Sequence, residues 1–126
     1  MRALIVDDSR VIRSILRRFL VAEGFETMFE AGDGAEALER LKEVGTVDLA
    51  LVDWNMPRMN GLDFILAMRA CPEFAAIRVL MVTTEAEATQ MVRALEAGAN
   101  EYVMKPFTNE VLRDKLRLLG LGEGDA

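Results

Sequence analysis

Short apolar runs alternate with longer stretches in which apolar residues recur every three or four positions. Short, mainly apolar runs cover residues 3–6, 47–52, 77–82 and 101–104, and residues 25–30 alternate between apolar and polar in the manner of an edge strand. A stretch with helical spacing follows each of these five segments. Five strand–helix units predict an α/β fold, in which a five-stranded parallel sheet carries helices on both faces.

Polar residues of the capping type precede three of the helical stretches. They accept hydrogen bonds from the free N–H groups of a first helical turn, and here they are Ser9, Asp33 (three residues before Glu36, as in a capping box) and Thr108. No linker, repeat or low-complexity segment interrupts the pattern. We therefore predict one domain over residues 1–120 and a short acidic tail at 121–126.

Composition narrows the class of protein. The 126 residues carry a net charge of −6, which argues against binding to nucleic acid or to a membrane surface. One cysteine, Cys71, and no signal-like or membrane-spanning apolar run favour a cytoplasmic location. The chain contains no histidine, so histidine bases, ligands and phosphate carriers are excluded.

Chemically distinctive side chains stand at four of the five predicted strand ends. They are Asp7 and Asp8 after the first strand, Asp53 after the third, Thr83 after the fourth and Lys105 after the fifth. Each one alone is common in a turn or a helix cap. Because the carboxyl ends of parallel strands meet at one edge of a sheet, where such folds bind ligands, we expect all of them to converge there.

The converging set predicts phosphoryl chemistry. Three neighbouring carboxylates repel one another, which either raises their pKa values or requires a cation, and an oxygen-only set suits Mg²⁺. Asp53 is then a nucleophile of the aspartyl-phosphate type. Lys105 and the metal would neutralise charge on the transferred group, and Thr83 would donate a hydrogen bond to its oxygens.

Four segments carry a resemblance to a known family. IVDDS, LVDWNMPRMNGLD, VLMVTTEAE and AGANEYVMKPF, spread over residues 3–119, are similar to the response-regulator receiver domain. The resemblance implies the flavodoxin-like strand order 2-1-3-4-5. It also implies that Asp53 accepts a phosphoryl group from a histidine kinase or a small donor such as acetyl phosphate. Asp7, Asp8, Asp53 and the backbone carbonyl of Asn55 would bind Mg²⁺, with Mn²⁺ as an alternative ion.

The same resemblance implies a two-state switch. Lys105 would contact the phosphoryl group with Pro106 fixing its loop, Thr83 would move toward the phosphate, and Tyr102 would turn inward. Polar residues at positions 55 and 85, Asn55 and Glu85, would give the phosphoryl group a short lifetime. The chain would catalyse only its own phosphorylation and dephosphorylation and would not be an enzyme acting on other substrates.

Partners also follow from the family. A histidine kinase or phosphotransfer domain would dock on the first helix, where Arg10, Arg13 and Arg17 form a basic stripe. A downstream protein target would bind the fourth helix, fifth strand and fifth helix. We expect a monomer acting in chemotaxis, or else a phosphorelay intermediate or the receiver of a longer regulator.

Three other classes compete with this interpretation. A haloacid-dehalogenase-type phosphatase needs a second aspartate two residues after the nucleophile, where this chain has Asn55. A flavodoxin-like cofactor carrier needs an uncharged phosphate-binding loop, whereas the first strand here ends in two aspartates. A phosphate-independent pseudo-receiver is disfavoured because the full acceptor set is present.

Overall fold

The computed structural model describes residues 1–84 and 88–121. Within them a five-stranded parallel sheet has the order β2-β1-β3-β4-β5, which confirms the predicted α/β fold and strand order. The strands are β1 (Arg2–Val6), β2 (Thr27–Ala31), β3 (Leu49–Val52), β4 (Arg78–Thr83) and β5 (Glu101–Met104).

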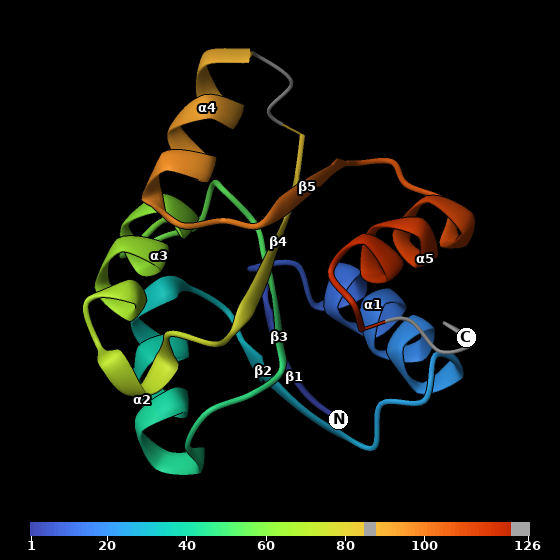
Figure 1. The fold of residues 1–126 in the computed structure, drawn as a ribbon, viewed down its shortest axis with the longest axis horizontal. Helices are drawn as coiled ribbons and strands as arrows, with labels where there is room; N and C mark the ends of the chain where they lie inside the picture. The colour runs from blue at the N-terminus through green and yellow to red at the C-terminus, as the bar shows by residue number, and fades with distance from the viewer. Residues whose placement is uncertain (85–87, 122–126) are drawn as a thin grey trace.

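Helices cover both faces of the sheet, as Figure 1 shows. Helices α2 (Gly34–Val44), α3 (Gly61–Arg69) and α4 (Ala88–Ala97) lie on one face, and α1 (Arg10–Ala22) and α5 (Asn109–Leu118) lie on the other. A short 3-10 helix, η1 (Pro72–Phe74), follows α3. Each face has its own apolar core, and the central strands β1 and β3 contribute side chains alternately to the two.

The predicted helix caps are confirmed. Ser9 Oγ accepts a hydrogen bond from the backbone N–H of residue 12 (3.2 Å), and Thr108 Oγ1 accepts one from that of residue 111 (3.1 Å). Asp33 Oδ1 accepts one from the N–H of Glu36 at 2.9 Å. These caps fix where α1, α5 and α2 begin, just beyond the carboxyl ends of β1, β5 and β2.

Strand boundaries differ from the prediction by one or two residues. The second strand begins at Thr27 rather than at Phe25, because Thr27 is the residue that pairs with Arg2 at the start of β1. Phe25 precedes the strand, is 3% exposed and packs in the core beneath α1 and α5. The apolar residue Phe25 therefore made the predicted strand begin two residues too early.

The end of the chain is described through Leu121, which packs against the core between α1 and α5. The other residues of the predicted tail, 122–126, lie outside the described part. Among the helices that the structure describes, none has the length and hydrophobicity needed to cross a bilayer.

Candidate functional site

The predicted residues converge at the carboxyl ends of the strands. Asp7 follows β1 and Asp53 follows β3, and each is held by a strand-like backbone bond to its neighbour. The N–H of Asp7 donates to the carbonyl of Ala31 (3.1 Å), and that of Asp53 donates to the carbonyl of Val6 (2.9 Å). The sheet therefore fixes the position of both carboxylates.

Lys105, which follows β5, forms ion pairs with both aspartates. Its Nζ lies 2.7 Å from Asp7 Oδ2 and 3.5 Å from Asp53 Oδ1. The lysine side chain is only 15% exposed, and its backbone N–H bonds to the carbonyl of Thr83 at 3.0 Å. The peptide bond between Lys105 and Pro106 is cis.

One lysine does not neutralise this cluster. Ligand oxygens of Asp7, Asp8 and Asp53 all lie within 4.8 Å of one another. Burial and the charge of Asp7 raise the pKa of Asp53 to about 6, against the opposing effects of Lys105 and the Trp54 N–H. Three crowded carboxylate oxygens, two from buried residues and one from an exposed residue, fit a hard divalent cation such as Mg²⁺, which also keeps several water ligands.

The loop after Asp53 folds tightly back onto it. The N–H of Gly61, the first residue of α3, donates to the carbonyl of Trp54 at 2.9 Å. A Cβ atom on Gly61 would collide with the carbonyl oxygen of Asp53, so only glycine permits this approach. Asn55, whose carbonyl is a predicted metal ligand, is exposed in this loop.

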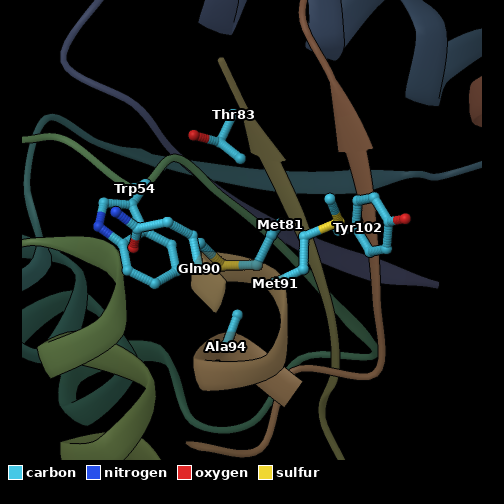
Figure 2. Close-up of a pocket in the computed structure, with 7 residues that line it drawn as sticks. All are labelled: Trp54, Met81, Thr83, Gln90, Met91, Ala94 and Tyr102. Carbon is cyan, nitrogen blue, oxygen red and sulfur yellow. The ribbon is translucent and has the colours of Figure 1, made fainter. Parts of the chain in front are cut away.

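Thr83 and Tyr102 border one small cavity beneath α4, as Figure 2 shows. Its free volume is about 10 Å³, which is about one water-sized sphere. Trp54 also lines the cavity and is only 7% exposed, so it packs against neighbouring residues. The Tyr102 ring is half-buried, and the ammonium of Lys115 lies 5.1 Å from its centroid.

The basic stripe of α1 is partly engaged inside the molecule, through a residue that the sequence analysis overlooked. Glu30, near the end of β2, accepts hydrogen bonds from Arg13 Nε (3.0 Å) and Arg17 Nε (2.8 Å). Arg13 Nη1 also donates to the backbone carbonyl of Asp7. Arg10 is exposed. The spacing of the two arginines on one helix face, opposite an acidic strand end, was the available signal.

The structure thus brings Asp7, Asp8, Asp53 and Lys105 into one cluster and places Thr83 and Tyr102 beside a common cavity. Glu85, the other predicted tuning residue, lies outside the described residues. Two further features carried no sequence signal: the Asp33–Arg58 ion pair and the side chain of Gln90, which lines the cavity.

Comparisons with known proteins identify the family of the chain. Residues 3–117 match the family model described as the response regulator receiver domain, and the chain belongs to that family. It is 42% identical to chemotaxis protein CheY1 of Helicobacter pylori, over 99% of this chain and 100% of the relative. It is 45% identical to chemotaxis protein CheY of Pseudomonas aeruginosa, over 92% of this chain and 93% of the relative. The structure of CheY4 from Vibrio cholerae superposes with a TM-score of 0.86 at 33% identity, covering 94% of this chain and 97% of that one.

Proposed function

We propose that this protein is a phosphorylation-dependent signalling switch, in which Asp53 accepts a phosphoryl group and the surface of α4, β5 and α5 changes in response. The observation that carries the proposal is the placement of Asp53 between Asp7 and Lys105 at the carboxyl end of the central strand β3. With a pKa of about 6, Asp53 is mostly ionised at neutral pH and can act as a nucleophile.

In the transfer step, a carboxylate oxygen of Asp53 attacks the phosphorus of the donor. A P–O bond forms, the bond from phosphorus to the donor's imidazole nitrogen breaks, and the electron pair stays on that nitrogen. Lys105 stabilises negative charge on the phosphoryl oxygens. Hydrolysis reverses the modification, because water attacks the phosphorus and restores the carboxylate. The chain thereby catalyses only its own modification and its removal.

Asp7, Asp8 and Asp53, together with the Asn55 carbonyl, would hold Mg²⁺ or Mn²⁺. The bound ion supplies charge neutralisation and orients the phosphoryl oxygens. The residues of the chain fit this role, because Asp7 is fixed by backbone bonds: its Oδ1 accepts the N–H of Ser9 at 2.8 Å. Removal of the ion should leave the carboxylates repelling one another and the acceptor slow.

The switch would operate through the cavity that Thr83 and Tyr102 share. A volume of about 10 Å³ cannot hold a phenol ring. Movement of Thr83 toward the phosphate would make room for Tyr102 to turn inward, which alters the surface that a protein target reads. The names of the relatives suggest chemotaxis as the pathway. The family resemblance suggests a histidine kinase as the donor, and we propose that the protein acts as a monomer in the cytoplasm.

The test is the fluorescence of Trp54, the single tryptophan, whose backbone N–H donates to Asp53 Oδ1 at 2.8 Å. We expect Mg²⁺ to quench this fluorescence and acetyl phosphate to change it further. In the Asp53→Asn variant the response to acetyl phosphate should disappear. Because some receivers do not react with small donors, the fluorescence measurement is repeated with a phosphohistidine donor.

If neither donor changes the wild-type signal in the presence of Mg²⁺, Asp53 is not an acceptor. The protein would then be a phosphate-independent pseudo-receiver that acts only through protein contacts. A phospho-dependent signal that survives in Asp53→Asn would place the modification on another residue.

A further inference from the structure

The loop that follows Asp53 is docked onto the start of α2 by three separate contacts. Arg58 Nε and Nη2 donate to the two carboxylate oxygens of Asp33, at 2.9 and 3.2 Å. The N–H of Gly34 donates to the carbonyl of Met59 at 3.0 Å. A Cβ on Gly34 would lie 2.9 Å from that same carbonyl oxygen, closer than real Cβ atoms approach, so the two backbones touch.

Asp33 is well suited to anchor the loop. Its side chain is 10% exposed, and the same carboxylate caps α2 through the N–H of Glu36. The hydrogen bond from Arg58 lowers the pKa of Asp33, so the carboxylate is charged across the physiological range. The bidentate geometry, in which both oxygens meet the guanidinium, defines orientation as well as distance.

Arg58 has an unusual backbone conformation. Its φ of 63° lies in the left-handed region, where it is the only non-glycine among the described residues. Such a conformation is unfavourable for a residue with a side chain, because the Cβ atom comes too close to the following carbonyl oxygen. It persists where surrounding contacts hold it in place, and these outliers gather at functional sites. Here two contacts meet this residue: the ion pair with Asp33, and the hydrogen bond from the Met59 N–H to the Pro57 carbonyl (2.7 Å), which spans Arg58.

The backbone held in this way is the one that carries Asn55. The loop is closed at its base by Gly61 and Trp54 and fixed at its outer side by Arg58 and Met59. We propose that the Asp33–Arg58 pair holds this loop in place, positions the Asn55 carbonyl and thereby sets the affinity for Mg²⁺. This inference rests on the proposed metal site. Both members are positioning residues, because neither belongs to the acidic cluster itself.

The experiment is a Mg²⁺ titration followed by Trp54 fluorescence, with the melting temperature measured on every variant. Arg58→Ala should weaken Mg²⁺ binding about tenfold, the scale seen when an outer partner of a metal ligand is lost. Arg58→Gly removes the ion pair but permits the left-handed backbone, and it should lose as much affinity as Arg58→Ala. Arg58→Lys keeps the charge without the bidentate geometry and should recover part of the loss.

The matched control is Arg40→Ala. Arg40 pairs with Glu43 on α2 at 3.7 Å, in an exposed position, and its removal should leave the Mg²⁺ affinity unchanged. Wild-type affinity in Arg58→Gly together with a loss in Arg58→Ala would overturn the proposal, because backbone conformation alone would then explain the effect.

Equal affinity in all variants would overturn this role of the pair and leave the acceptor function standing. A wild-type protein that does not respond to Mg²⁺ would overturn both proposals. A drop in melting temperature without a change in affinity would assign the pair a purely structural role.

Discussion

The two halves of the site are built differently. The acidic half, defined by Asp7, Asp8, Asp53 and the loop through Gly61, is fixed by backbone hydrogen bonds and by contacts that leave no room for a methyl group. The switch half, defined by Thr83, Tyr102 and the residues of α4 that face them, encloses a cavity. Transfer chemistry requires reacting atoms held in place, whereas a switch requires space into which a side chain can move.

The largest effect is expected where the acidic half is tightest. Gly61→Ala should destabilise the protein by about 3 kcal/mol or more, because the new Cβ would collide with the Asp53 carbonyl oxygen. Urea denaturation measures the difference. Gly45→Ala is the control. The φ of Gly45 is 84°, and an added Cβ would meet nothing within 4 Å, so only backbone strain of about 1 kcal/mol is added. Equal losses in the two variants would show that the loop can relax.

The next largest effect concerns the negative charge of Asp53 in the acidic half. Asp53→Asn should stabilise the metal-free protein by about 1–2 kcal/mol at pH 7, about half the full conversion of the pKa shift, because the carboxyl is only partly desolvated. The folded-state pKa of about 6 exceeds the ordinary value of 3.8, so the folded state binds the proton more tightly. Wild-type stability from this group therefore falls as pH rises from about 4 to about 6, and the advantage of the variant grows over that window.

Glu30→Gln provides the opposite case. Urea denaturation of both variants and the wild type at a series of pH values measures the two differences. Burial of Glu30 opposes its ionisation, but the hydrogen bonds from Arg17 and Arg13 outweigh burial and lower its pKa below 4.5. A lowered pKa contributes stability above the ordinary value that is lost as pH falls through the folded-state value. The variant should therefore be less stable than the wild type at pH 7, and the difference should shrink in acid. A common sign for both variants would contradict the electrostatic account.

The smallest effect is expected in the switch half. The Oε1 atom of Gln90 is buried beside the cavity and has no hydrogen-bond partner within the described structure. Gln90→Met replaces the amide with an apolar group of similar length and should stabilise the protein by about 0.5–1 kcal/mol, measured by thermal unfolding. A loss of stability would mean that the oxygen is satisfied in solution, and the cavity would then be wetter than its volume indicates.

Sequence patterns predicted the features that follow from local chemistry or from the regular alternation of strands and helices. Helix caps and strand order were recovered because capping chemistry is local and the family motifs cover almost the whole chain. The cluster of Asp7, Asp53 and Lys105 was predicted because parallel strands bring their carboxyl ends to one edge.

The remaining features depend on pairs that are distant in sequence and follow no period. Asp33 and Arg58 are 25 residues apart, and Arg58 stands in a loop where neither strand nor helix spacing constrains it. Glu30 was overlooked, although its partners Arg13 and Arg17 lie on one face of α1. Which carboxylate an arginine in a loop contacts is decided by packing, and no short sequence pattern predicted the partner of Arg58.

The hydrogen bond between Lys105 and Asp7 joins residues 98 positions apart, the first and last strands of the fold. A ribosome releases β1 before β5, and a domain generally folds as one unit. A nascent chain that ends before Lys105 therefore has the two aspartates without their lysine. If Asp53 is the acceptor, as proposed, phosphoryl transfer would require the last strand to be synthesised and docked, and an unfinished chain would carry no signal.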